Sequence, residues 1–380
     1  MSRKRKIIFV TATRADYGKL KSIILKMQSS EKFETRVFVT GMHNMRLYGK
    51  TSDELKKDKI KNLFIYNNQT LKSSMNDIFI KTIQGFSNFA TNENPDLVIV
   101  HGDRLEALAC TISSLLQKVK VAHIEGGEVS GTLDEILRHS ISKLAHVHFV
   151  TNNKAKKRLT QMGENKKNIF VTGSPDIDII LKKKLPSLEE VKKRYQIKFD
   201  NYSIAILHSV VTNTKSLKKE VKIFFDSLIK SNKNYIIIYP NNDLGSDIIL
   251  KHIMTLRKNK KFKIYPSVRF ECFLTLLKNS KFIIGNSSCG IIEAPYYTIP
   301  TINIGNRQHN RVEKRDTIFN ISFNSNQIIK TIKKLENISF KKDNFFGKGN
   351  ANDLILKLML SHKFWKTSIQ KNFIDIAGIR

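Results

Sequence analysis

The sequence predicts an α/β protein made of two Rossmann-like domains that face one another across a cleft. Short apolar runs rich in Val, Ile and Phe recur along the chain, and helical spacing follows them, as in parallel sheets covered on both faces. A Lys- and Glu-rich stretch at 182–194, which contains Pro186, separates two such series. The length of 380 residues corresponds to two or three domains of about 150 residues each.

The first half contains the longer series. Strands are expected at residues 7–10, 37–39, 97–100, 119–124, 149–150 and 169–171. The apolar stretch 105–116 predicts a helix, and another is predicted from the spacing of Leu20, Ile23, Ile24 and Met27. We also place the segments 138–140 and 146–148 on a helix and interpret them as mainly structural.

The second half repeats the alternation. Strands are expected at residues 203–207, 235–239, 282–284 and 301–304, each followed by polar residues. We therefore expect a first domain over 1–184 and a second domain over 185–363.

The chain is strongly basic, with 66 Lys and Arg against 33 Asp and Glu and a net charge of +33. Pairs such as Lys56-Lys57 and Lys166-Lys167 are scattered along the chain, with no nucleic-acid-binding motif beside them. We interpret the charge as a solvated, Lys-rich surface and expect no nucleic-acid partner. A positive field would still favour a small polyanionic substrate such as a nucleotide diphosphate.

The cysteines and the apolar runs indicate the compartment. The three cysteines are far apart, form no CxxC pair and predict neither a disulfide framework nor a zinc site. The apolar run 7–10 is shorter than the ~7–15 residues of a signal peptide. No apolar run approaches the ~20 residues that span a bilayer. We expect a cytoplasmic protein without membrane insertion.

Polar residues gather directly after the predicted strands. Such residues often cap the next helix. Here, however, six strand ends carry Gly, His, Asp, Arg, Ser or Asn together. Open α/β sheets bind ligands outside the carboxyl ends of their strands, so the pattern indicates a binding site.

The segment Gly285-Asn286-Ser287-Ser288-Cys289-Gly290 precedes a helical pattern at 291–294. Small residues with free N–H groups at a helix N-terminus suit a diphosphate. Glu293 could accept hydrogen bonds from a ribose diol, or it could be an ordinary residue on the surface of a helix.

Two residues at other strand ends leave alternatives open. Arg14 could bind a phosphate with its guanidinium fork, or it could pair with Asp16. His208 could be a turn histidine, or it could donate a hydrogen bond to a leaving phosphate.

Carboxylates are expected to converge in the first half. Asp103 and Glu106 follow one strand, Glu125 and Glu128 follow the next, and Asp134 and Glu135 come shortly after. Converging carboxylates are what general acid–base chemistry requires, although any one of them alone would more often be a cap or an ion pair.

These segments resemble the hydrolysing UDP-N-acetylglucosamine 2-epimerases. The resemblance runs through nearly the whole chain and rests on the motifs at 11–19, 40–43, 101–109, 123–132, 138–144, 173–176, 239–243, 269–271, 285–288 and 365–371, with Phe373.

The resemblance implies a glycosyltransferase-B-like fold whose C-terminal helix, 364–380, packs back onto the first domain. It implies a metal-free reaction without a cofactor, in which UDP-N-acetylglucosamine and water give UDP and N-acetylmannosamine for sialic acid synthesis. It also implies a homodimer and a bacterial setting in surface polysaccharide synthesis.

The resemblance further implies roles for individual residues. Catalysis is expected of Asp103, Glu125 and Asp134, with His208 near the diphosphate. Phe270 is expected to pack on the uracil. The expected substrate-binding residues are Arg14, Arg104, Asn242, Arg269, Phe270, Ser287, Ser288 and Glu293.

The segment 208–213 departs from the family pattern His-Pro-Val-Thr-Thr-Glu. Ser209 replaces the Pro and Asn213 replaces the Glu, while His208 is kept. We expect activity, with changed affinity for the substrate. The main alternative is a subgroup that acts on UDP- or GDP-linked diacetamido sugars of the bacillosamine type for legionaminic acid synthesis. A non-hydrolysing epimerase and a glycosyltransferase are further alternatives.

Overall fold

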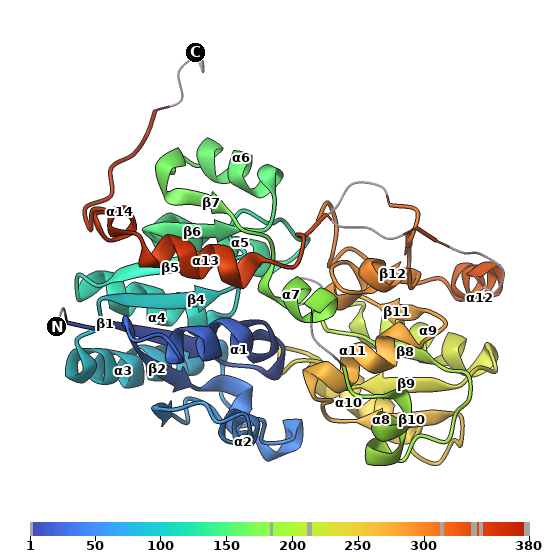
Figure 1. Ribbon diagram of the computed structural model, residues 1–380. Helices are drawn as coiled ribbons and strands as arrows, with labels where there is room; N and C mark the ends of the chain where they lie inside the picture. The colour runs from blue at the N-terminus through green and yellow to red at the C-terminus, as the bar shows by residue number, and fades with distance from the viewer. Residues whose placement is uncertain are drawn as a thin grey trace. The chain divides into compact units, whose positions relative to one another are not determined.

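The computed structural model describes residues 3–182, 185–210, 215–311, 315–335, 340–341 and 345–375. The chain forms two compact units, each an α/β domain of the Rossmann type (Figure 1). The first unit comprises Met1–Glu128, Asp134–Lys182 and Phe345–Arg380, and the second comprises Val129–Leu133 and Lys183–Asn344.

The first unit contains a seven-stranded parallel sheet in the order β3-β2-β1-β4-β5-β6-β7. Its strands are β1 (Arg5–Thr11), β2 (Phe33–Val39), β3 (Leu63–Ile65), β4 (Leu97–His101), β5 (Lys120–Ile124), β6 (Val147–Val150) and β7 (Ile169–Val171). Its α-helices are α1 (Arg14–Gln28), α2 (Ser52–Lys57), α3 (Met75–Glu93), α4 (Leu105–Leu116), α5 (Leu133–Leu144), α6 (Asn153–Gln161), α7 (Pro175–Lys182), α13 (Ala351–Leu360) and α14 (His362–Trp365). Short 3₁₀ turns are η1 (Gly41–Asn44), η2 (Arg46–Tyr48) and η3 (Lys166–Asn168).

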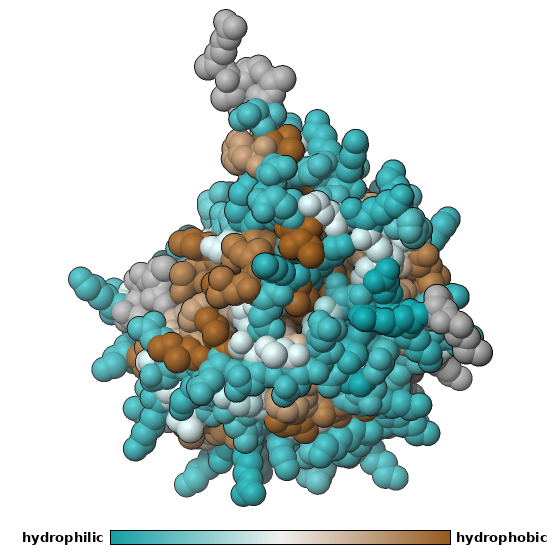
Figure 2. Space-filling model, turned by 90° about the vertical axis from the view of Figure 1, so that its left-hand side faces the viewer, coloured by the Kyte–Doolittle hydropathy of each residue, from teal (hydrophilic) through white to brown (hydrophobic). Residues whose placement is uncertain are grey.

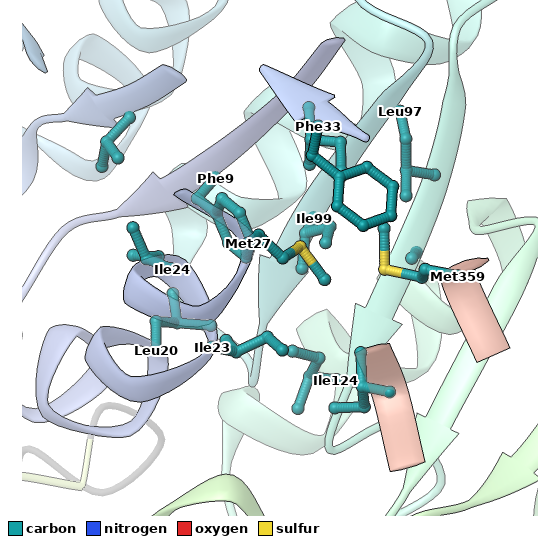
Figure 3. Packing of buried hydrophobic residues seen from close by; sticks show 14 of the residues in the cluster. Phe9, Leu20, Ile23, Ile24, Met27, Phe33, Leu97, Ile99, Ile124 and Met359 are labelled. Carbon is teal, nitrogen blue, oxygen red and sulfur yellow. The ribbon is translucent and has the colours of Figure 1, made fainter. Parts of the chain in front are cut away.

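Both faces of this sheet are buried, which explains the uninterrupted apolar runs of its central strands. Ile7 and Phe9 of β1 belong to the core beside α1 and α13, whereas Ile8 and Val10 belong to the core beside α3 and α4. Successive side chains of a strand point to opposite faces, so each central strand needs apolar residues at every position. In Figure 3, Phe9, Met27, Ile99 and Met359 lie together on the first of these faces.

The C-terminal segment returns to the first unit earlier than the sequence predicts. Ile355 and Met359 of α13 and Phe364 of α14 are buried in the core beside α1 (Figure 1, red). This burial places 345–363 in the first unit rather than in the second domain. The expected helix over 364–380 is wrong, because α14 ends at Trp365 and the described residues 366–375 are not helical.

The second unit repeats the arrangement with a six-stranded parallel sheet in the order β10-β9-β8-β11-β12-β13. Its strands are β8 (Ser203–Ile206), β9 (Tyr235–Ile238), β10 (Phe262–Tyr265), β11 (Ile283–Gly285), β12 (Thr301–Ile304) and β13 (Ile318–Ile321). Its helices are α8 (Leu188–Tyr195), α9 (Leu217–Lys230), α10 (Ser246–Thr255), α11 (Phe270–Lys278) and α12 (Ser325–Lys334), with 3₁₀ turns η4 (Ser288–Gly290) and η5 (Ala294–Tyr297).

In each sheet the strand order reverses next to the unit's first strand. These switch points lie between β1 and β4 in the first unit and between β8 and β11 in the second. Helices leave the sheet in opposite directions at such a point, so the loops diverge and leave room for a ligand at the carboxyl ends of the strands. Each unit therefore offers one place where a site is expected.

Two further expectations about secondary structure are wrong. The segment 146–148 does not continue a helix, because α5 ends at Leu144 and Val147 begins β6. The pattern at 291–294 does not form an α-helix, because only the short turns η4 and η5 occur there. The predicted strands are all present, and β3, β10 and β13 add to them.

The surface agrees with the interpretation of the charge. Hydrophilic side chains cover most of the face in Figure 2, with apolar residues in smaller groups. Lys56, Lys57, Lys166 and Lys167 are exposed.

Candidate functional site

The turn after β1 is held by a buried carboxylate. Thr11 donates a hydrogen bond to Asp16, and the backbone N–H groups of Ala12 and Thr13 donate to Asp16 at 2.9 and 3.2 Å. His43 Nε2 lies 2.9 Å from the hydroxyl of Thr11, and His43 Nδ1 lies 2.7 Å from the hydroxyl of Thr51. Burial opposes the charge of Asp16, but His43, Thr11 and Ala12 together lower its pKa. Asp16 thus fixes the start of α1.

Arg14 does not pair with Asp16, so that alternative is wrong. Its guanidinium instead makes a two-pronged ion pair with Glu54 of α2, in which Nε lies 3.2 Å from Oε2 and Nη2 donates to Oε1. The carboxylate of Asp16 already accepts hydrogen bonds from the residues of the turn, which explains why Arg14 pairs with Glu54 instead. Both partners are only partly exposed, so this guanidinium is held in one orientation.

A buried ionic cluster lies at the carboxyl ends of β4 and β5, beside α1 and α7. Lys19 Nζ lies 3.3 Å from Glu125 Oε1 and 3.4 Å from Asp176 Oδ2. His101 Nε2 lies 3.4 Å from Glu125 Oε2. All four side chains are buried. Burial lowers the pKa of His101, so its ring is neutral at pH 7.

The backbone at this cluster is strained. Glu125 has φ of 70°, in the left-handed region that residues with a side chain rarely adopt. His123 Nε2 lies 2.7 Å from the carbonyl oxygen of Gly102, and Ser142 lies 3.0 Å from His123 Nδ1. Burial lowers the pKa of His123 to about 3, so the ring is a neutral donor to Gly102. Such strain is found where a site over-determines the conformation.

Asp103, in the loop after β4, pairs with a fully buried arginine. Arg138 of α5 donates through Nη2 to Asp103 Oδ2 and through Nη1 to the carbonyl oxygen of Glu128 at 3.2 Å. Arg138 is 0% exposed, whereas the side chain of Asp103 is 25% exposed. The carboxylate of Asp103 is therefore held by a buried arginine while part of its side chain stays accessible to solvent. Asp134 precedes Arg138 by one helical turn and shares its side of α5.

Arg104 contacts a carboxylate rather than open solvent. Its Nε lies 3.5 Å from Oε2 of Glu106, which is 1% exposed in the first turn of α4. Glu106 Oε1 also lies close to Gly41, where a Cβ atom would come within 2.8 Å of it. Glu106 thus fills the space between the loops that follow β2 and β4.

In the second unit, His208 lies at the switch point between β8 and β11. The backbone N–H of His208 donates to Asn286 Oδ1 at 2.7 Å, and Asn286 Nδ2 donates to the backbone carbonyl oxygen of His208 at 2.9 Å. The N–H of Asn241 donates to His208 Nδ1 at 3.1 Å, so Nε2 carries the proton of the neutral ring. His208 is thereby prepared as a hydrogen-bond donor through Nε2.

The segment after β11 carries the predicted anion-binding serines on a 3₁₀ turn. Ser287 directly precedes η4 and accepts a hydrogen bond from Cys289 Sγ, and Ser288 begins the turn. Since no α-helix follows, the expected position of these serines at a helix N-terminus is wrong. Glu293 is not on a surface helix, because it is 4% exposed and precedes η5. Burial, with the nearby charge of Glu293, raises the pKa of Cys289 to about 12.

The remaining predicted nucleotide contacts come from other loops of the second unit. Arg269 precedes α11, and its backbone N–H donates to the hydroxyl of Tyr195 at 3.0 Å. Phe270 begins α11 and is only 9% exposed. Asn242 is half-buried in the turn after β9. Asn213 lies outside the described residues.

The structure thus groups the predicted residues by unit. Asp103 and Glu125 lie at the carboxyl ends of the adjacent strands β4 and β5. Arg104 is in the same loop as Asp103, and Arg14 follows β1, the neighbour of β4 on its other side. Five residues that hold them were not among the predicted site residues, namely Lys19, His101, Asp176, Arg138 and Asn286. A signal was available for Lys19 and Asp176, because both end motifs that carry the family resemblance.

Among the residues that the structure describes, no group of three or more His, Cys, Asp or Glu residues could hold a metal ion. None of the helices in the described ranges is long and apolar enough to cross a membrane.

Comparisons with known proteins give a consistent result. The family model for UDP-N-acetylglucosamine 2-epimerases matches residues 25–360. UDP-N-acetylglucosamine 2-epimerase of Neisseria meningitidis serogroup B is 40% identical over 376 residues, which cover 98% of this chain and 99% of that protein. UDP-N,N'-diacetylbacillosamine 2-epimerase (hydrolyzing) of Legionella pneumophila is 34% identical over 362 residues, or 93% of this chain and 95% of that protein.

A solved structure has the same fold. The crystal structure of UDP-GlcNAc 2-epimerase from Neisseria meningitidis bound to UDP-GlcNAc has a TM-score of 0.77 at 21% identity, over 93% of this chain and 99% of that chain. At this identity the likeness concerns the fold, whereas the family match and the 40% identity concern the sequence. The chain therefore belongs to the UDP-N-acetylglucosamine 2-epimerase family, whose members are nucleotide-sugar 2-epimerases.

Proposed function

We propose that this protein is a hydrolysing 2-epimerase that converts UDP-N-acetylglucosamine and water into UDP and N-acetylmannosamine. The observation that carries the proposal is the 40% identity, over nearly the whole of both chains, to the Neisseria meningitidis enzyme. The hydrolysing course is supported by the Legionella relative, whose name describes a hydrolysing epimerase. The product would then feed sialic acid synthesis.

The reaction needs groups that handle protons on two faces of the sugar ring. The C2–H group of the sugar is only weakly acidic, so removal of its proton is coupled to cleavage of the C1–O bond to UDP. The electron pair of the C2–H bond forms the C1–C2 double bond of 2-acetamidoglucal, and the pair of the C1–O bond leaves with UDP. Water then adds at C1 while a proton returns to C2 from the opposite face.

Carboxylates in the first unit would supply this proton handling. Asp103 is held by Arg138 and faces solvent, whereas Glu125 is buried against Lys19. Different surroundings separate the proton affinities of two carboxylates, which is the usual way to obtain an acid and a base in one site. Asp134 would be the third carboxylate, on the same side of α5 as Arg138.

The second unit would hold UDP. His208 presents Nε2–H as a donor, which would stabilise negative charge on the leaving diphosphate. Ser287 and Ser288 would contact the phosphates, and Glu293 would accept hydrogen bonds from the ribose. The other substrate contacts are proposed for Asn242, Arg269 and Phe270 of the second unit and for Arg14 and Arg104 of the first unit.

The second candidate is a hydrolysing epimerase of UDP- or GDP-linked N,N'-diacetylbacillosamine. It is favoured by the Legionella relative, which is 34% identical over 93% of this chain and bears that activity in its name. Cytoplasmic location and a homodimer are further parts of the proposal, the latter from the family resemblance.

Incubation with UDP-N-acetylglucosamine in deuterated water, followed by proton NMR, tests the proposal. Free N-acetylmannosamine with deuterium at C2, together with UDP, is the expected result. UDP-N-acetylmannosamine as the product would contradict the hydrolysing course. Turnover only of the diacetamido sugar nucleotide would select the second candidate, and inertness toward all of these substrates would refute both.

A further inference from the structure

Asp176 is a buried carboxylate to which the proposed reaction gives no role. It is 0% exposed and is the second residue of α7. Its Oδ1 accepts a hydrogen bond from the N–H of Ile177 at 3.0 Å. Its Oδ2 has no hydrogen-bond partner among the described residues, and lies 3.4 Å from Lys19 Nζ. A buried charge is costly unless it is paired, so Lys19 is its compensating group.

Lys19 is shared between this carboxylate and a second one. Its ammonium lies 3.3 Å from Glu125 Oε1, and its side chain is only 9% exposed. The neighbouring His101 is neutral at pH 7, because burial lowers its pKa, and it adds no positive charge. One ammonium therefore faces two carboxylates, so that its charge is divided between them.

The second carboxylate keeps Lys19 paired when Glu125 is protonated, which an isolated Lys19–Glu125 pair would not do. If Glu125 took up a proton in such a pair, the buried ammonium would lose its counter-ion. With Asp176 present, Lys19 keeps a carboxylate partner when Glu125 is neutral, and it bridges both carboxylates when Glu125 is charged. Each protonation state of Glu125 thus leaves the ammonium paired.

We propose that Asp176 is a positioning residue that enables Glu125 to exchange a proton during turnover. The inference rests on the proposed function, in which Glu125 is a catalytic carboxylate. The proton that Glu125 receives, from the sugar carbon or from water, converts its carboxylate to the neutral acid. Its later release restores the carboxylate, so no other reactant is needed. Asp176 acts through Lys19 and does not touch the substrate.

The surroundings of Glu125 define which groups share in its titration. Lys19 of α1 and His101 at the end of β4 lie against its two carboxylate oxygens. The electrostatic neighbours of these residues are Asp16 of α1, His123 of β5 and Asp176 of α7. Of the two aspartates, Asp176 is paired with Lys19 at 3.4 Å, whereas Asp16 is held by the backbone of the turn after β1. Removal of Asp176 therefore changes the charge next to Lys19 directly.

The test follows the protonation of Glu125 in two ways, by carbon-13 NMR of its carboxyl group and by the pH dependence of kcat/KM. Carboxyl-labelled glutamate would be followed by carbon-13 NMR, with the Glu125 signal assigned by its loss in Glu125→Gln. In Asp176→Asn, the negative charge that shares Lys19 with Glu125 is removed, so the titration of Glu125 is expected to move to lower pH by about one pH unit. The acid limb of the kcat/KM profile is expected to move with it, and kcat to fall about ten-fold with little change in KM. Asp176→Ser is a second neutral variant.

The matched control is Asp178→Asn on the same helix. Asp178 is also buried, but it accepts hydrogen bonds from the N–H groups of Ala351 and Asn352, each at 2.8 Å. Its loss should lower stability without moving the Glu125 titration. Lys19→Met should move that titration to higher pH, because the anion then loses its counter-ion.

An unmoved Glu125 titration in folded Asp176→Asn and Asp176→Ser would overturn the inference. The same shift in Asp178→Asn would overturn it as well, since it would then reflect general loosening of α7. If the wild-type protein turns over no sugar nucleotide, the proposed function fails. The carboxyl titration still decides whether Asp176 controls Glu125.

Discussion

His208 and Asn286 bind one another twice, the side chain of Asn286 pairing with both the N–H and the carbonyl oxygen of His208. These bonds join the loops that follow β8 and β11, the two strands at the switch point of the second sheet. Asn286 also accepts, at its own carbonyl oxygen, hydrogen bonds from Arg307 and Gln308. One buried amide therefore sets the position of the histidine that is proposed to face the diphosphate.

Replacing Asn286 with Ala is expected to lower the free energy of unfolding by about 2 to 4 kcal/mol, because it leaves two buried backbone groups of His208 without partners. Urea unfolding measures this loss. Asn234→Ala is the control, since Asn234 makes an exposed hydrogen bond to Asn201 and should cost less than about 0.5 kcal/mol. A similar cost in both variants would contradict the assigned role.

Gly41→Ala is expected to lower the free energy of unfolding by about 2 to 4 kcal/mol. Gly41 has φ of 62°, and an added Cβ would lie 2.6 Å from the carbonyl oxygen of Ala12 and 2.8 Å from Glu106 Oε1. Gly102→Ala is the matched control. Its φ is 71°, but its Cβ would meet only Glu125 Oε2, at 3.8 Å, so about 1 kcal/mol of backbone strain is expected. Thermal or urea unfolding of both variants compares the two costs, and equal values would show that the close contacts at Gly41 relax freely.

Arg138→Lys is expected to reduce kcat/KM at least about ten-fold while the protein stays folded. Arg138 contacts Asp103 and the carbonyl oxygen of Glu128 from one planar group, and a lysine cannot make both contacts in the same geometry. Steady-state kinetics with the sugar nucleotide measures the loss. Arg36→Lys, which alters an ion pair with Glu93 in the same unit, should leave the kinetics unchanged. Wild-type activity in Arg138→Lys would remove Asp103 from the proposed catalytic groups.

Glu164 is expected to make the free energy of unfolding depend on pH in the acidic range. Burial opposes its charge, but His148 and Lys371 lower its pKa from 4.5 to about 2. A carboxyl whose pKa is lower in the folded protein stabilises the fold above its unfolded pKa and loses that effect as the pH falls toward 2. Glu164→Gln should therefore cost about 2 to 3 kcal/mol at pH 7, and the difference from wild type should shrink between pH 4.5 and 2.

Urea unfolding at several pH values would measure this dependence on Glu164. Asp247→Asn is the control, because Asp247 and its partner Lys251 are both exposed. A difference between wild type and Glu164→Gln that stays constant down to pH 2 would disprove the linkage.

The pattern of apolar residues along the chain predicts the two α/β series and the strands at the centre of each sheet. Central strands such as β4 are buried at every position, so they read as continuous apolar runs. The strands that the sequence analysis missed, β3, β10 and β13, are all at sheet edges. Their residues are mostly half-buried or exposed, as in Phe262–Tyr265, so no continuous apolar run marks them.

The sequence also determined which residues lie at strand ends, and hence Asp103, Glu125 and His208 as candidates. The partners of these residues depend on how the helices and strands pack together. Lys19 and Asp176 are distant in the chain, but they meet because α1 and α7 pack side by side at the carboxyl edge of one sheet. The same holds for Asp103 with Arg138 and for Arg14 with Glu54. An ion pair depends on the distance between charged atoms, and between residues far apart in the chain that distance exists only once the strands have taken their order in the sheet.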